Sequence, residues 1–82
     1  MKVTVKKKQI GMPVSIHTEF IKLEAALKLA NAVSSGGEAK NLIIDGYAKV
    51  NGEICTMRGK KLYPGDSFEL MDQKFIVVSN ES

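Results

Sequence analysis

The 82-residue chain has no tryptophan, one histidine and one cysteine, and only 6% of its residues are aromatic. The single cysteine, Cys55, excludes an internal disulfide and a metal site built from several cysteines. Because aromatic residues are so few, the core must consist mainly of Leu, Ile, Val and Ala. No apolar run approaches membrane-spanning length, and the N-terminus lacks the apolar segment of a secretory signal. We therefore expect one small cytoplasmic domain of modest stability, with no membrane partner.

Residues suited to catalysis are equally scarce. His17 is the single histidine, and neither Cys55 nor any serine lies in a nucleophile motif. The nine acidic residues show no spacing typical of metal ligands. The sequence therefore predicts a protein that is not an enzyme, has no catalytic residues and binds neither a metal nor a cofactor. A small hydrolase or transferase that uses His17 or Cys55 is the weakest alternative.

Hydrophobic periodicity in the first half of the chain predicts strands followed by helices. Residues 2–6 alternate polar and apolar, which is typical of a half-buried strand, and Gly11-Met12-Pro13 is expected to break it. Residues 14–16 and 20–21 then resemble a second strand. Apolar residues at helical spacing predict a helix over 23–33.

A second, shorter helix is marked by its ends. Ser35 followed by Glu38 is a capping box, in which each side chain binds a backbone N–H at the helix start. Gly46 is suited to the left-handed conformation that closes a helix.

Beyond Gly46 the period changes to two. Residues 47–50 and 53–56 flank Asn51-Gly52, a strong hairpin signal, and Pro64-Gly65-Asp66 predicts another turn before strands at 67–70 and 74–78. The fold class is therefore α+β, with two short helices packed on a small antiparallel sheet and an added N-terminal strand, in a single domain over 1–82. The predicted core consists of Leu23, Leu27, Ala30, Leu42, Ile43, Val50 and Ile54.

Basic residues outnumber acidic ones by 12 to 9, giving a net charge of +3. We expect Lys6, Lys7 and Lys8 to guard an edge strand against aggregation, since consecutive strand residues cannot share one face. The glycines at 36 and 37 leave N–H groups at the second helix start open to an anion. Cations near the second helix, the hairpin and the loop that follows it suit RNA. We expect these cations and the two glycines to form one continuous anion-binding face. Lys74 is expected to lie outside this face.

The ordered segments KLE at 22–24, SGGEAKNLI at 35–43, GYAKVNG at 46–52 and PGD at 64–66 resemble a known family. It is the RNA-binding domain named after small-subunit ribosomal protein S-four. Segments LKLA at 27–30, SGGEAK at 35–40 and RGKKLY at 58–63 are closer still to its small stand-alone bacterial branch, the YaaA/YbcJ-type proteins. The resemblance covers about residues 21–70 and implies an αL-type motif whose two helices and hairpin form a basic RNA-binding surface.

These features together predict a protein that binds RNA, ribosomal or otherwise structured, mainly through phosphate contacts. The family often has Arg where Lys22 and Lys40 stand, and lysine favours recognition by shape and charge over bidentate contacts. The alternative is an interaction module that docks an acidic protein partner. The predicted RNA-binding residues are Lys22, Ser35, Gly36, Gly37, Lys40, Tyr47, Lys49, Arg58, Lys60 and Lys61.

Overall fold

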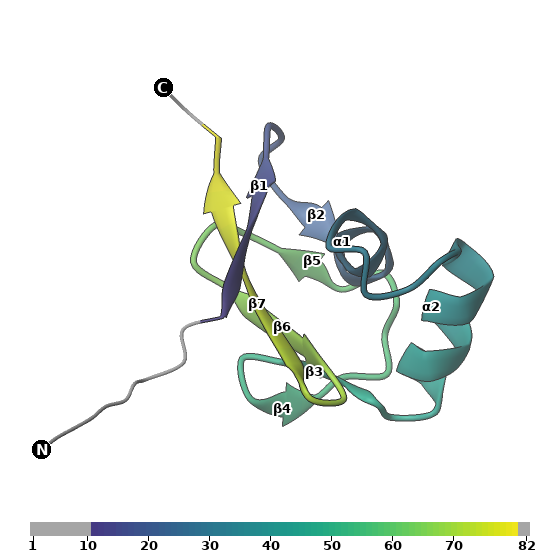
Figure 1. Ribbon diagram of the computed structural model, residues 1–82. Helices are drawn as coiled ribbons and strands as arrows, with labels where there is room; N and C mark the ends of the chain where they lie inside the picture. Colours follow the sequence, from purple (N-terminus) through teal and green to yellow (C-terminus); the bar gives the residue numbers. More distant parts are fainter. Residues whose placement is uncertain (1–10, 81–82) are drawn as a thin grey trace, which may run out of the picture.

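The structure is a computed structural model that describes residues 11–80. In chain order its elements are β1 (Met12–Ile16), β2 (Ile21–Lys22), α1 (Leu23–Leu29), α2 (Gly36–Ile44), β3 (Ala48–Val50), β4 (Glu53–Ile54), β5 (Lys61–Leu62), β6 (Ser67–Leu70) and β7 (Gln73–Ser79). Strands β1, β7, β6, β3 and β4, in that order, form a five-stranded sheet, and β2 pairs with β5. Both helices lie against one face of the larger sheet (Figure 1), which confirms the α+β class. The strand predicted at 2–6 and the lysines at 6–8 lie outside the described residues.

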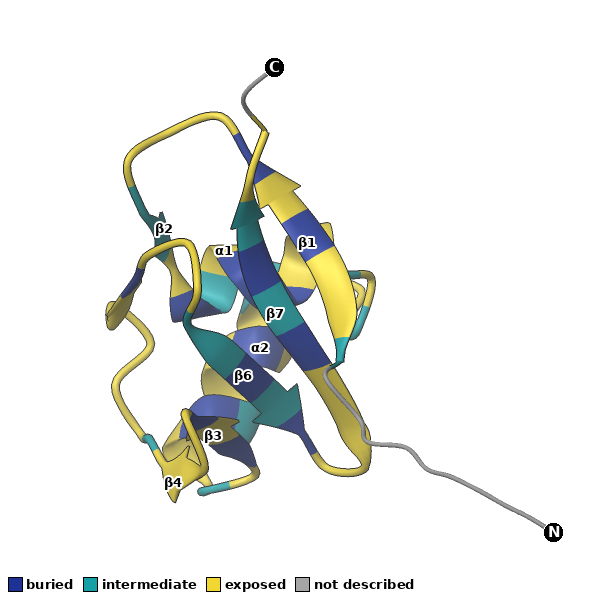
Figure 2. Cartoon of the chain, turned by 90° about the vertical axis from the view of Figure 1, so that its left-hand side faces the viewer, coloured by how far each residue is buried: buried dark blue, intermediate teal, exposed yellow. Residues whose placement is uncertain are grey.

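The core lies between the helices and the inner face of the five-stranded sheet. Alternate residues of each long strand point into it, so buried and more exposed positions alternate along β1 and β7 (Figure 2). Of the predicted core residues, Leu23, Leu27, Ile43 and Val50 are buried, while Ala30 and Leu42 are half-buried against the cluster. Within residues 11–80 the buried residues are Val14, Ile16, Leu23, Ala26, Leu27, Val33, Ala39, Ile43, Ala48, Val50, Leu62, Phe68, Leu70, Phe75 and Val77.

Helix α1 ends at Leu29, earlier than the predicted end at residue 33. Asn31 adopts a left-handed conformation with φ of 60°. Its N–H donates to the carbonyl of Lys28, and the N–H of Ala32 donates to that of Leu27. This pattern is a Schellman motif, which closes the helix with asparagine in the place usually taken by glycine.

Both predicted ends of α2 are confirmed. The Ser35 hydroxyl accepts from the N–H of Glu38 at 3.2 Å, and the Glu38 carboxylate accepts from the N–H of Ser34 at 2.7 Å. At the other end Gly46 has φ of 87°, and the N–H of Tyr47 donates to the carbonyl of Leu42. A variant of the capping box, in which Glu38 accepts from the residue before the N-cap, and a Schellman motif therefore delimit α2.

The predicted hairpin at Asn51-Gly52 is present, but Ile54 is not part of the core. Asn51 and Gly52 both have positive φ, as a two-residue hairpin turn of this kind requires. The turn places Ile54 opposite Lys49, and residues directly opposite each other project from the same face of a sheet. Lys49 points outward, so Ile54 does too and is 64% exposed.

Pro13 lies inside β1 and does not break it. The carbonyl of Ile16 accepts from the N–H of Asn80, so in the parallel β1–β7 ladder Ile16 and every second residue before it bond towards β7. Pro13 has the opposite parity, and its nitrogen faces away from the sheet at the edge, where no ladder bond is lost. The sheet is therefore mixed, with one parallel pair, and is not antiparallel throughout.

Replacing Leu27 by alanine should destabilise the fold by about 2–5 kcal/mol, because Leu27 is completely buried between helix and sheet. Urea denaturation followed by circular dichroism measures this loss. Leu29→Ala is the matched control, since Leu29 is 53% exposed on the same helix and should lose less than about 1 kcal/mol. Equal losses would contradict the packing of α1 described here.

Replacing Ser35 by alanine should lower the free energy of unfolding by about 0.5–2 kcal/mol, because the N–H of Glu38 loses its acceptor. Ser34→Ala removes a hydroxyl one residue earlier. The bond between residue 34 and Glu38 uses only the backbone N–H, which alanine retains. Thermal unfolding of the two variants should therefore separate them, and a loss confined to Ser34→Ala would refute the capping box.

Candidate nucleic-acid interface

Lys22 and Lys61 face each other across the two-stranded sheet. They are register partners in the antiparallel β2–β5 pair, and both are exposed. The neighbouring pair in this sheet is Ile21 with Leu62, and Leu62 is completely buried. The apolar pair thus points towards the core and anchors the strands, while the two ammonium groups share the outward face.

The turn that precedes β5 is bound to the first turn of α1. The N–H of Leu23 donates to the carbonyl of Lys60 at 2.9 Å, and the N–H of Glu24 donates to that of Arg58 at 3.1 Å. Backbone carbonyls therefore satisfy two of the donors that a helix start leaves unpaired. The side chains of Arg58 and Lys60 both remain exposed.

Arg58 lies near Lys22 in a shallow depression of about 330 Å³, lined by Lys22, Glu24, Ala25, Arg58 and Gly59. The Arg58 Nε atom is 3.9 Å from Glu24 Oε1, and the two side chains are 51% and 38% exposed. A pair this long and this exposed stabilises the fold by less than about 1 kcal/mol. Arg58 can therefore exchange this partner for an anion at little cost.

Lys60 lies between the basic residues at the start of α1 and the β3–β4 hairpin. A second depression of about 340 Å³ contains Lys60 and Met57 together with hairpin residues that include Ile54. Ile54 is in turn the register partner of Lys49. The turn before β5 and the β3–β4 hairpin therefore lie next to each other.

On the side of β3 away from β4, the neighbouring strand β6 places a carboxylate opposite Lys49. Glu69 of β6 is the register partner of Lys49, and Lys74 of β7 is the partner of Glu69. The three residues form a row of alternating charge on the outer face of the sheet. Lys74 was expected to lie away from the predicted binding face, yet it shares this sheet face with Lys49 across Glu69. The positive field of Lys49 is correspondingly reduced, whereas Tyr47 remains 53% exposed next to it.

The start of α2 stands apart from the hairpin. The helix has nine residues and leads into β3 from its C-terminal end (Figure 1), so Gly36 lies about 13 Å along the axis from that end. Ser35, Gly36 and Gly37 therefore occupy a different region from Lys49, while Lys40 lies midway along the helix. The single face predicted to join these residues remains a prediction.

The two glycines of α2 are not required by packing. A Cβ atom on Gly36 would meet nothing within 4 Å, and one on Gly37 would meet only Ser35 Oγ at 3.9 Å. Neither residue has a positive φ. The backbone here is open to close approach, although the Glu38 carboxylate already lies at the helix start.

Two aromatic residues that were not predicted as part of the site lie beside Lys61. The Lys61 Nζ atom is 4.9 Å from the centre of the Phe20 ring, and the ring centres of Phe20 and Tyr63 are 5.8 Å apart. The signal that could have identified them is the period of two in Phe20-Ile21-Lys22 and Lys61-Leu62-Tyr63. Each tripeptide has one inward apolar residue between two outward residues.

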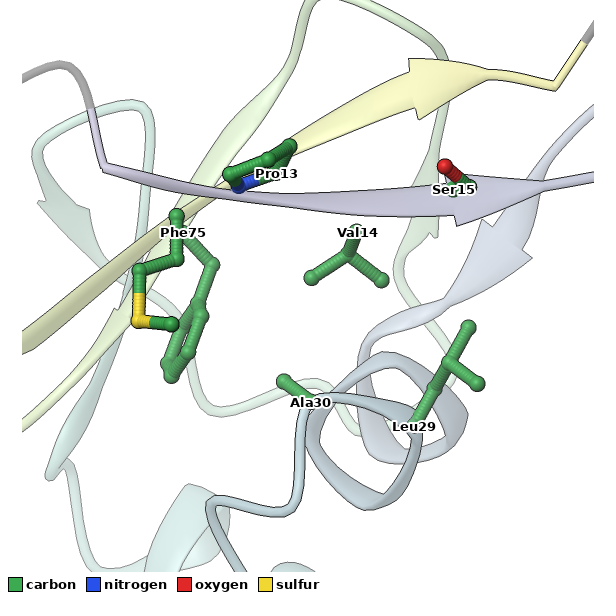
Figure 3. A pocket seen from close by; sticks show the side chains of 7 residues that line it. Pro13, Val14, Ser15, Leu29, Ala30 and Phe75 are labelled. Atoms are coloured by element: carbon green, nitrogen blue, oxygen red, sulfur yellow. The ribbon is translucent and has the colours of Figure 1, made fainter.

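Other parts of the described chain offer less for an anionic ligand. An apolar groove of about 360 Å³ lies between β1 and the end of α1, lined by Met12, Pro13, Val14, Ser15, Leu29, Ala30 and Phe75 (Figure 3). It contains no charged side chain and cannot bind phosphate. Within residues 11–80, no group of three or more His, Cys, Asp or Glu side chains could hold a metal ion. Neither helix of this region is long and apolar enough to cross a membrane.

Comparison with known proteins identifies the family. The sequence model of the S4 domain matches residues 14–78, a range that contains both helices, the two-stranded sheet and all ten predicted RNA-binding residues. The chain is also similar to the probable ribosome maturation protein RlbA of Bacillus subtilis (strain 168). The two are 47% identical over 58 residues, which are 71% of this chain and 82% of that protein.

Proposed function

The chain belongs to the S4 domain family, and we propose that it binds structured RNA through phosphate contacts made by its exposed basic residues. The observation that carries this proposal is the grouping of Lys22, Arg58, Lys60 and Lys61 around the start of α1. Among the described residues, only Glu24 forms an ion pair with a member of this group, and that pair is weak. The surrounding potential is therefore positive and suits a polyanion.

The binding mode follows from the residue types and from where they lie. Lysine is a point charge on a flexible chain, so a surface of mainly lysines recognises the position of phosphates and not the edges of bases. Tyr47 and Lys49 extend this surface along the hairpin. A second contact area, from the start to the middle of α2, consists of Ser35, Gly36, Gly37 and Lys40. One RNA molecule contacts both areas only if its fold is wide enough to span the distance between them. Recognition by shape and charge is therefore the mode we propose.

The RNA we propose is ribosomal RNA, because the similar protein RlbA is named as a probable ribosome maturation protein. On this proposal the chain acts by binding alone, with no catalytic step.

Replacing Arg58 or Lys61 by glutamine should weaken binding to ribosomal RNA fragments by up to about fivefold each, within the ~1 kcal/mol limit of an exposed ion pair. Each change should also reduce the slope of log affinity against log salt by about one, because one fewer counterion is released. Filter binding at several potassium chloride concentrations measures both quantities.

The control for these variants is Lys74→Gln, which removes the same charge from β7 next to Glu69. It should change neither the affinity nor the salt slope by a comparable amount. If Lys74→Gln matched Lys61→Gln, only net charge would matter and the proposed surface would be wrong.

A second candidate function is docking of an acidic protein. Ile54 and Met57 are 64% and 65% exposed next to Lys60, and exposed apolar side chains beside a cation also suit a protein partner. The two functions differ in their sensitivity to ribonuclease. We expect the macromolecules recovered with the tagged chain from a bacterial lysate to be lost after complete RNase digestion. An undiminished set of protein partners after digestion would instead favour the docking function.

A further inference from the structure

The outward face of the β2–β5 pair combines two aromatic rings with two cations. Lys22 and Lys61 are register partners, and Phe20 and Tyr63 continue the same register at the next outward position. The contacts agree with this placement, because Lys61 Nζ lies 4.9 Å from the Phe20 ring centre and the two rings are 5.8 Å apart. These four side chains, which we call the β2–β5 face, therefore form one continuous surface.

The two aromatic residues are held in place by local hydrogen bonds. The N–H of Tyr63 donates to the Asp66 carboxylate at 2.8 Å, and the N–H of Asp66 donates back to the Tyr63 carbonyl at 2.8 Å. The Phe20 carbonyl accepts from the Thr18 hydroxyl at 2.7 Å. The backbone of each ring is thus fixed before any ligand arrives, which lowers the entropy lost on binding.

The charge arrangement is unfavourable without a ligand. Like charges directly opposite each other destabilise a sheet, and Lys22 and Lys61 are such a pair. A phosphate between the two ammonium groups would turn this repulsion into two attractions.

The two rings offer an unpaired base an exposed aromatic surface on which it can stack. Tyr63 is 43% exposed, and Phe20 is half-buried beside it. Bases outside a duplex stack on aromatic side chains, while neighbouring cations bind the backbone phosphates. Inside a duplex, stacked neighbours cover both faces of each paired base, so such rings cannot reach them. The combination therefore distinguishes single-stranded from double-stranded RNA.

We infer that the β2–β5 face binds an unpaired nucleotide of the RNA, with its base stacked on Tyr63 and its phosphate between Lys22 and Lys61. This inference rests on the proposed function and deepens it, since it assigns a single-stranded element to the recognised RNA. A purely structural role for the rings is the competing explanation, because Phe20 and Tyr63 lie against each other and Lys61 stabilises Phe20 through a cation–π contact. Leucine at position 63 would keep an apolar side chain beside Phe20, but it has no ring to stack on a base.

A tryptophan reporter tests the stacking directly, because the chain has no tryptophan of its own. The probes are an RNA hairpin with a single-stranded adenosine tail and the same hairpin with a blunt end, both closed by the same compact tetraloop, so that the two RNAs differ only in the unpaired bases of the tail. The fluorescence of Tyr63→Trp should be quenched by the tailed hairpin and much less by the blunt one. Met12→Trp is the control reporter: Met12 is 66% exposed at the start of β1, and its fluorescence should respond equally weakly to both RNAs.

Affinity provides the second readout. Tyr63→Leu should reduce the ratio of affinities for tailed and blunt hairpins about tenfold, the loss expected for one stacked base, while Tyr63→Phe should retain most of the ratio. If the leucine variant does not fold, the quenching result decides. Binding of both RNAs without selective quenching, or with a ratio that leucine leaves unchanged, would overturn the inference and leave the proposed function standing. If the wild-type chain bound neither RNA, the proposed function would fail as well.

Discussion

The basic surface depends on one interaction, the docking of the turn at residues 57–60 against the start of α1. Lys22 occupies the N-cap position, where its ammonium group cannot accept a hydrogen bond, and a cation there opposes the helix dipole. The carbonyls of Arg58 and Lys60 supply the missing acceptors. The backbone of the basic turn thus stabilises the helix start, while its side chains add further positive charge. The charge that would bind RNA belongs to side chains, because the N–H groups of Leu23 and Glu24 are already occupied.

Features set by neighbouring residues could be predicted from the sequence. The capping box at Ser35 and Glu38, the helix end at Gly46 and the hairpin turn at Asn51-Gly52 all depend on side chains or φ angles within a few residues. The predicted end of α1 was wrong because apolar spacing continues to Val33, whereas the helix is closed by the left-handed conformation of Asn31. Asparagine adopts that conformation less readily than glycine, so its helix-ending role was the weaker signal.

Features set by distant residues could not be predicted. Pro13 lies in a strand because its nitrogen faces the sheet edge, which depends on parallel pairing with β7 at the other end of the chain. The electrostatic potential around Lys49 depends on its register with Glu69, and the side of the sheet from which Ile54 projects depends on its register with Lys49. The basic residues of the candidate surface were predicted from the sequence as a set, and their role in binding stays a prediction. The distance of the α2 start from the hairpin, and the rings beside Lys61, followed only from the packing.

Leu62 anchors the two-stranded sheet in the core that the five-stranded sheet forms with the helices. A two-stranded ladder of two residues per strand is too short to be stable alone. It persists because Leu62 is completely buried in the same core as the helices, while the next residue on each side remains exposed. Since β-strand side chains alternate, burying Leu62 necessarily directs Lys61 and Tyr63 outward together. A single buried leucine thus holds a cation and an aromatic ring in a fixed relation on the surface. The core that stabilises this small domain thereby also sets the geometry of its candidate nucleotide site.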